Sequence, residues 1–110
     1  MDAHLPLRPV ACAVLAALAD DARPGIDILE AVNATVPGRP ILGPGTLYRL
    51  LRELRQAELI ARTGASGDAA DERQVHHELT PLGRSVLRAD LERLRRTIAL
   101  AGRARPAAER

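Results

Sequence analysis

Residues 43–56 combine a stripe of leucines with a row of polar side chains. The leucines recur at i, i+3, i+4 and i+7, which predicts an α-helix with one buried face: Leu47, Leu50, Leu51 and Leu54. On the other faces, Arg49 and Arg52 each carry a guanidinium that can donate two hydrogen bonds to a guanine edge. Thr46 and Tyr48 offer hydroxyl groups to DNA phosphates. We therefore expect these four polar residues to contact DNA in the major groove.

The same pattern also fits an ordinary helix with one solvent-exposed face. In that case Arg49 pairs with Glu53 one turn later, a contact that contributes about 0.2–0.5 kcal/mol. The helix alone does not separate the two interpretations, so the neighbouring elements must.

Two shorter helices are predicted before this segment, as in a helix-turn-helix. Residues 7–19 are apolar on every side, and residues 20–25 contain the Pro and Gly of a turn. Residues 26–36 place four apolar side chains on one face: Ile26, Leu29, Val32 and Val36. A helix that is apolar all round is normally buried on two sides. We therefore expect a second subunit to cover residues 7–19, with Val14 at the contact.

A two-stranded wing is predicted after the third helix. Residues 59–63 and 74–79 are short segments of strand type, and the polar residues 64–73 form the loop between them. Arg62 and Arg73 at the base of the wing are predicted to contact phosphates. The loop itself carries three carboxylates that would repel phosphate: Asp68, Asp71 and Glu72.

The last predicted helix begins at Thr80-Pro81, with Thr as the N-cap and Pro at the first helical position. A seam of apolar residues follows at spacings of four, three and four, which is typical of helices that pair: Leu87, Leu91, Leu94 and Ile98. We predict that this seam forms a homodimer.

These elements predict an α+β, mainly α fold. It consists of a winged helix-turn-helix domain (residues 7–79, with three helices and a two-stranded wing), a C-terminal dimerisation helix (80–101) and a flexible tail (102–110).

Composition excludes several classes of protein. The chain of 110 residues has a net charge of +2, one Cys and no long apolar run, so we expect no internal disulfide, no membrane span and a cytoplasmic location. The start of the chain lacks the basic-then-apolar order of a signal peptide. No nucleophile–base pattern or phosphate loop is present, so we predict no enzymatic activity, and no metal or other cofactor.

Three further residues have reactive side chains. His76 and His77 are neighbours on a predicted strand and point to opposite faces, so they cannot readily bind one ion together. His77 is expected in the core and His76 in solvent. Cys12 could sense oxidants at a dimer interface, but inert burial is the commoner state of a lone Cys.

Two strings resemble the PadR family of bacterial transcriptional regulators. Gly45-Thr46-Leu47-Tyr48 is followed by leucine and isoleucine at the family's spacing: Leu51, Leu54, Leu59 and Ile60. Leu79-Thr80-Pro81-Leu82-Gly83-Arg84 is similar to the family's Leu-Thr-x-x-Gly-Arg step from the wing into the last helix. A weaker likeness lies at residues 25–29, and the resemblance covers about residues 7–100. The single short last helix resembles the compact subclass.

This resemblance implies a winged-helix homodimer that represses promoters and is released by a small molecule. Such a dimer would set two copies of the third helix in successive major grooves and read a pseudo-palindromic operator. The chain departs from the family where Arg49 replaces a proline or small residue and where Glu58 replaces a glycine. An aliphatic, Arg-rimmed cavity at the dimer interface would suit a small or anionic effector. The alternatives are a winged-helix module that binds protein without DNA, and a ligand carrier without a regulatory role.

Overall fold

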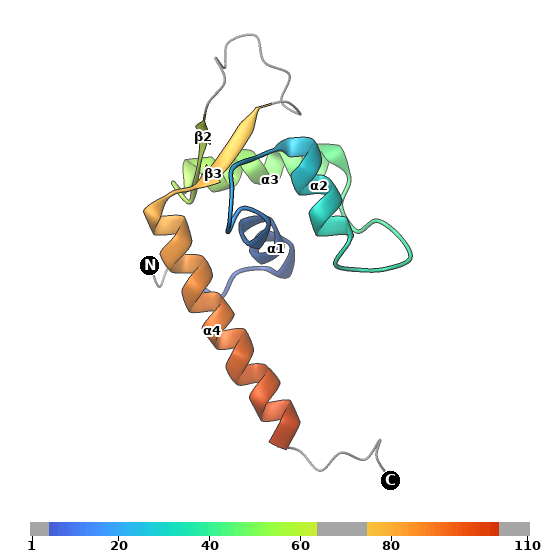
Figure 1. Ribbon diagram of the computed structural model, residues 1–110, viewed down its shortest axis with the longest axis vertical. Helices are drawn as coiled ribbons and strands as arrows, with labels where there is room; N and C mark the ends of the chain where they lie inside the picture. The colour runs from blue at the N-terminus through green and yellow to red at the C-terminus, as the bar shows by residue number, and fades with distance from the viewer. Residues whose placement is uncertain (1–4, 64–74, 104–110) are drawn as a thin grey trace.

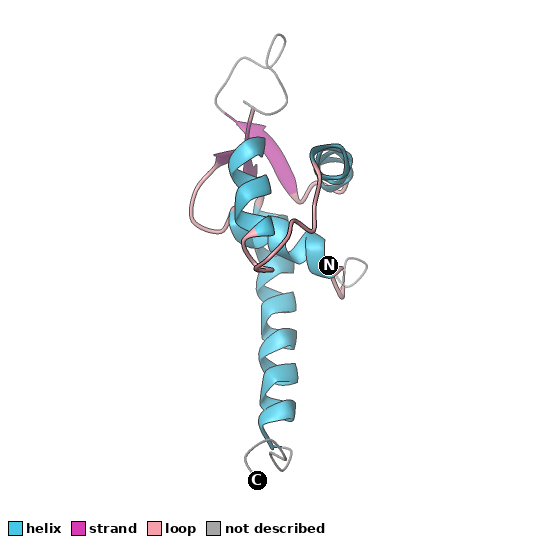
Figure 2. Cartoon of the chain, turned by 90° about the vertical axis from the view of Figure 1, so that its right-hand side faces the viewer, coloured by secondary structure: helices cyan, strands magenta, loops and turns pink. Residues whose placement is uncertain are grey.

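The computed structural model describes residues 5–63 and 75–103 of the chain. The fold consists of four helices and a small antiparallel sheet that lies at one end of the molecule (Figures 1 and 2), so the predicted mainly α fold is confirmed. In chain order the elements are α1 (Pro9–Ala17), β1 (Arg23–Pro24), α2 (Gly25–Asn33), α3 (Pro44–Gln56), β2 (Ile60–Thr63), β3 (His76–Leu79) and α4 (Pro81–Arg103).

Helix α1 lies in the middle of the folded domain, where it packs against α2 and α4 (Figure 1). Val14 and Leu15 in α1 have no exposed surface. The apolar faces of α1 are thus largely covered within one subunit, which corrects the expectation that a partner buries them. Val14 is part of the core and is not available for a contact between subunits.

The sheet has three strands in the order β1-β3-β2, not two as predicted. Strand β1 comes from the segment predicted as a turn, and pairs Arg23 with His77 and Pro24 with His76. The Nε atom of Arg23 also donates a hydrogen bond of 2.8 Å to the carbonyl oxygen of Ala17, which fixes the strand beside the end of α1. The added strand sets the start of α2 directly against the wing.

Helix α3 ends in a Schellman motif that turns the chain into β2. The N–H groups of Glu58 and Leu59 donate to the carbonyl oxygens of Arg55 and Leu54, both at 2.9 Å. Glu58 occupies the left-handed position of this motif with a φ of 64°. Glycine is the usual residue there because a Cβ atom is disfavoured at positive φ. The positive φ thus explains the glycine that the family has at this position, where this chain has Glu58.

The start of α4 is fixed to the same turn. The Thr80 hydroxyl donates a hydrogen bond of 2.6 Å to the carbonyl oxygen of Glu58 and accepts one of 2.9 Å from the N–H of Gly83. The second bond confirms the predicted N-cap. A Cβ atom on Gly83 would overlap the carbonyl group of Leu59. Gly83 is therefore required for the close approach of α4 to the chain between α3 and β2.

Helix α4 starts in the core and ends in solvent (Figure 2). Leu87 is buried within the subunit, so it packs in the core and does not offer a surface to a partner, contrary to its predicted role. Leu91 and Leu94 are half-buried, whereas Ile98 is 71% exposed and Leu100 is 66% exposed. The helix continues to Arg103, two residues beyond its predicted end.

Candidate nucleic-acid interface

Helix α3 buries its four leucines and exposes a polar face. Thr46, Arg49 and Arg52 are exposed, as the sequence predicted. In residues 5–63 and 75–103, no ion pair or hydrogen bond involves the guanidinium of Arg49 or Arg52. The carboxylate of Glu53 instead lies 3.4 Å from the guanidinium of Arg8 in the segment before α1. Both cations of the α3 face can therefore bind an external acceptor.

The other residues predicted to contact DNA are Tyr48, Arg62 and Arg73, and the first two differ in their exposure to solvent. Tyr48 is half-buried and its hydroxyl oxygen is shielded from solvent, so this hydroxyl is not available to a phosphate in this conformation. Arg62 is exposed on β2. Arg73 and the acidic loop fall outside the described residues. Of the residues predicted to contact DNA, those that the structure describes with exposed side chains are Thr46, Arg49 and Arg52 on α3 and Arg62 on β2.

One side chain that the sequence analysis missed fixes the start of α3. The Oδ1 atom of Asn33, at the end of α2, accepts hydrogen bonds of 2.8 Å from the N–H groups of both Ile41 and Leu42. Its Nδ2 atom donates to the carbonyl oxygen of Leu42 at 2.9 Å. An Asn at a helix end before a Pro- and Gly-rich loop was the available signal, because short amide side chains often bind nearby backbone.

Comparison with known proteins decides the family. The model of the Transcriptional regulator PadR-like family matches residues 14–89, which include all of α2, α3 and the strands. The chain belongs to this family. Its members are transcriptional regulators, not enzymes. No curated protein sequence gives a significant match to the chain.

Solved structures agree with this PadR-like fold. A PadR family regulator from Clostridium difficile has a TM-score of 0.71 and 18% identity, over 86% of this chain and 96% of that chain. A transcriptional regulator from Clostridium thermocellum has a TM-score of 0.67 and 17% identity, over 86% of this chain and 88% of that chain. BpsR from Bordetella bronchiseptica, whose DNA binding is regulated by 6-hydroxynicotinic acid, has a TM-score of 0.67 and 27% identity, over 97% of this chain and 73% of that chain.

A buried carboxylate connects three parts of this PadR-like chain. Asp90 on α4 has no exposed surface. Its Oδ1 atom accepts hydrogen bonds from the Nε atom of Arg93 at 2.9 Å and from the N–H of Leu7 at 3.3 Å. Burial alone would raise the pKa of Asp90, but bonds from Arg93, Leu7 and the Cys12 thiol outweigh burial and lower it. Asp90 thus holds the segment before α1 against α4.

The thiol of the single cysteine, Cys12, is in an environment that makes it unreactive. Cys12 is buried in α1 next to Asp90. Burial, a hydrogen bond to Asp90 and the charge of Asp90 raise the pKa of the thiol to about 11, although the Arg93 cation opposes this shift. Because the thiolate is the reactive form, inert burial, and not oxidant sensing, fits the structure.

The two histidines are placed as predicted, with His77 buried and His76 exposed. No group of three or more His, Cys, Asp or Glu side chains in the described part of the chain could hold a metal ion. None of the described helices is both long and apolar enough to cross a membrane.

Proposed function

We propose that this PadR-like regulator is a homodimeric repressor that reads a pseudo-palindromic operator through α3 and is released by a small molecule. The exposed face of α3 is the observation that carries the proposal. Arg49 and Arg52 lie on a fixed helix with no competing partner in the described residues. A guanidinium in this state can form the bidentate contact to guanine, which is the commonest base-specific contact in protein–DNA complexes.

The dimer is supported by the distal part of α4, residues 91–103. Leu91 and Leu94 are half-buried there, and Ile98 and Leu100 are largely exposed. Apolar residues on one helix that extends away from its own core are typical of a helix that pairs with a second copy. A dimer would set two α3 helices in successive major grooves, about 34 Å apart.

Release by a small molecule is supported by the likeness to BpsR, whose DNA binding is regulated by 6-hydroxynicotinic acid. We also propose that the chain acts in the cytoplasm, where a regulator of this kind would meet DNA.

Footprinting on the DNA upstream of the chain's own gene tests the DNA-binding role. We expect a protected pseudo-palindrome whose affinity falls by orders of magnitude between about 50 and 200 mM salt. Arg52→Ala should weaken operator binding by about 1–3 kcal/mol and relax base preference at one position in each half-site. Arg88→Ala, at an exposed position of α4 that precedes the segment proposed for pairing, is the matched control and should bind the operator normally. A chain that shifts no DNA fragment but forms a stable complex with another polypeptide would favour the protein-binding alternative.

Sedimentation of Ile98→Glu tests the dimer. Because Ile98 is 71% exposed, the charge should leave the fold of the subunit intact while it prevents the pairing of α4. We expect a folded monomer that protects the operator weakly. A variant that remains dimeric would place the interface elsewhere.

A further inference from the structure

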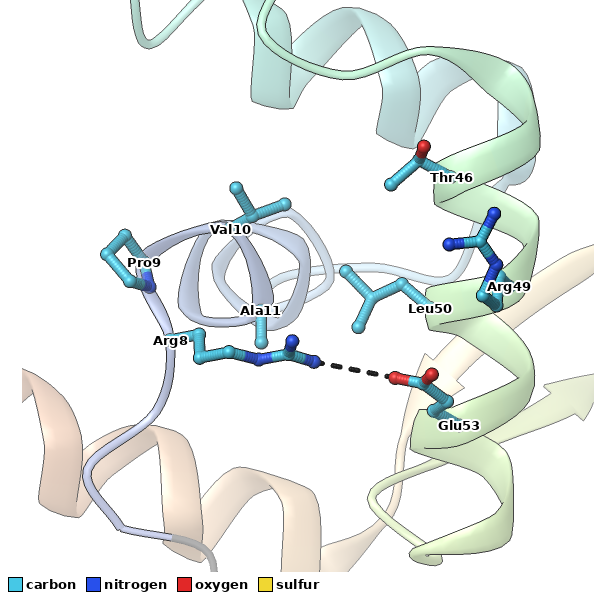
Figure 3. A pocket seen from close by; sticks show the side chains of 8 residues that line it. All are labelled: Arg8, Pro9, Val10, Ala11, Thr46, Arg49, Leu50 and Glu53. Atoms are coloured by element: carbon cyan, nitrogen blue, oxygen red, sulfur yellow. Dashed lines mark hydrogen bonds and ion pairs between the residues drawn. The ribbon is translucent and has the colours of Figure 1, made fainter.

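Glu53 is the only acidic residue of α3, where it stands among three arginines. Its side chain is 52% exposed, and it lies with Thr46 and Arg49 along one side of the helix (Figure 3). These three side chains line a cavity of about 330 Å³ between α3 and the start of α1. A carboxylate on this side of a DNA-binding helix is repelled by the phosphates of DNA. It is tolerated there only if a cation neutralises it or a base binds it.

A cation from another element neutralises Glu53. The Nη2 atom of Arg8, in the segment before α1, donates a hydrogen bond of 3.4 Å to the Oε1 atom of Glu53. Arg49 stands one turn before Glu53 and would be the local partner, but the contact is made by Arg8 instead. Both side chains of the pair are largely exposed in the free chain, so the pair is weak there. Contact with DNA would exclude water from the pair and strengthen it.

One carboxylate oxygen of Glu53 remains available as an acceptor. The hydrogen bond from Arg8 uses Oε1, and among residues 5–63 and 75–103 no hydrogen bond or ion pair involves Oε2. In the major groove the N4 amino group of cytosine donates a hydrogen bond, and Glu and Asp are the side chains that accept it. A carboxylate with one oxygen held by a cation and the other available fits this donor.

We propose that Glu53 reads a cytosine in each half-site of the operator, and that Arg8 is its positioning residue. Oε2 of Glu53 accepts a hydrogen bond from N4 of the cytosine while Arg8 holds Oε1. Because Arg8 supplies the cation, Arg49 keeps its guanidinium for a guanine. This assignment rests on the proposed function, since it needs α3 in the major groove.

The spacing of the two residues on α3 predicts where the cytosine lies. Glu53 follows Arg49 by four residues, which is about 6 Å along the axis of an α-helix. Successive base pairs of DNA are about 3.4 Å apart. A helix that lies along the groove therefore sets the two side chains about two base pairs apart. The cytosine should stand at this distance from the guanine that Arg49 reads.

Selection of binding sites from a random pool of duplex DNA tests the assignment without a known operator. The wild-type chain should prefer cytosine at one position of each half-site by at least about fivefold. Glu53→Gln should lose this preference in favour of adenine, because Gln forms two hydrogen bonds with the adenine edge. Glu30→Gln, at an exposed position of α2, removes the same charge and should keep the wild-type preference. An unchanged preference at every position in Glu53→Gln would overturn the reading of cytosine.

Variants of Arg8 separate a positioning role from a direct contact with DNA. Arg8→Gln should lower the preference for cytosine by about threefold and leave the base read by Arg52 unchanged. Arg8→Lys keeps the charge and should recover part of the preference. A uniform loss of affinity for all sequences, together with a smaller salt dependence, would mean that Arg8 binds a phosphate. That result would overturn its positioning role.

Cytosine methylated at N4 tests the hydrogen bond itself. The modified base still pairs with guanine, but a methyl group replaces the amino proton that faces the major groove. It should weaken binding of the wild-type chain at least about fivefold, whereas Glu53→Ala should bind both DNAs with affinities within about twofold. Equal losses in the two proteins would overturn the contact. A chain that selects no DNA sequence would overturn the proposed function as well, whereas a selected operator that does not depend on Glu53 overturns this assignment alone.

Discussion

Gly83 in α4 lies so close to the carbonyl group of Leu59 that a Cβ atom on Gly83 would overlap the carbonyl oxygen. That oxygen already accepts the N–H of Thr80 at 3.1 Å. The end of α3, the start of β2 and the first turn of α4 therefore meet at one point where backbone contacts backbone. None of these three elements can shift there without the others.

Replacement of Gly83 tests this contact. Gly83→Ala must move α4 away from the chain at Leu59, and we expect a loss of about 2–3 kcal/mol in the free energy of unfolding by urea. Gly102→Ala in the same helix has open space around it and should gain about 0.5–1 kcal/mol. If Gly83→Ala were as stable as the wild type, the close approach would be wrong.

At Glu58 we expect the opposite result, namely that a change to glycine stabilises the fold. Its φ of 64° is costly for a residue with a Cβ atom. Glu58→Gly should therefore raise the free energy of unfolding by about 0.5–1 kcal/mol, as measured by urea or heat. Arg52→Gly, at an exposed position inside α3, should lower it by about 1 kcal/mol. A destabilised Glu58→Gly would show that the side chain matters more than its backbone conformation.

Asn33 should affect stability and DNA affinity together. Asn33→Ala removes three hydrogen bonds to the loop before α3, and we expect a loss of about 1–3 kcal/mol in unfolding free energy. Operator affinity should also fall, because the start of α3 is less well fixed. Asn33→Asp keeps the two bonds accepted by Oδ1 and should recover most of both losses. Equal effects of Ala and Asp would contradict this role.

The pH dependence of stability reports on Asp90. Its pKa is lowered in the folded chain from an ordinary value of 3.8, so the carboxylate stabilises the fold above that pH. This contribution is lost as the pH falls through the lower folded-state pKa. Asp90→Asn should cost about 1–2 kcal/mol at neutral pH, and its difference from the wild type should shrink below about pH 4. A difference that stays constant from pH 7 to about pH 2 would exclude this linkage.

Labelling of Cys12 tests its burial. With a thiol pKa of about 11, only about one thiol in a thousand is ionised at pH 8. Ellman's reagent should therefore react at least about a hundredfold more slowly with the folded chain than with the chain in urea. Comparable rates in both conditions would mean that the thiol is exposed.

The sequence predicted some elements well because a local signal was present. Pro44 at the first turn and the leucine period placed α3 to within one residue, and Thr80-Pro81 placed the start of α4. Helix α2 was less predictable. Ile26 and Val36 were expected inward but are 38% and 40% exposed. Ile28 is buried instead, because the inward stripe of α2 runs through Gly25, Ile28 and Val32, and the helix ends at Asn33, before Val36.

Other features depend on partners that are distant in the sequence. Strand β1 has two residues and becomes a strand only because β3 pairs with it. Asp90 is buried through a bond to Leu7, 83 positions away. At the predicted interface, the exposure of Arg49 and Arg52 followed from the helical period, but the shielded hydroxyl of Tyr48 depends on packing that no local pattern reveals.

The contact between Gly83 and Leu59 joins α4 rigidly to the chain between α3 and β2, so that a rotation of α4 also rotates α3. In a dimer joined through residues 91–103, any change in the angle between the two α4 helices would turn each winged domain as one body. The separation of the two α3 helices on DNA would then be set far from α3 itself. A regulator built in this way can acquire a new operator spacing through substitutions in α4, while the residues that read the bases stay the same.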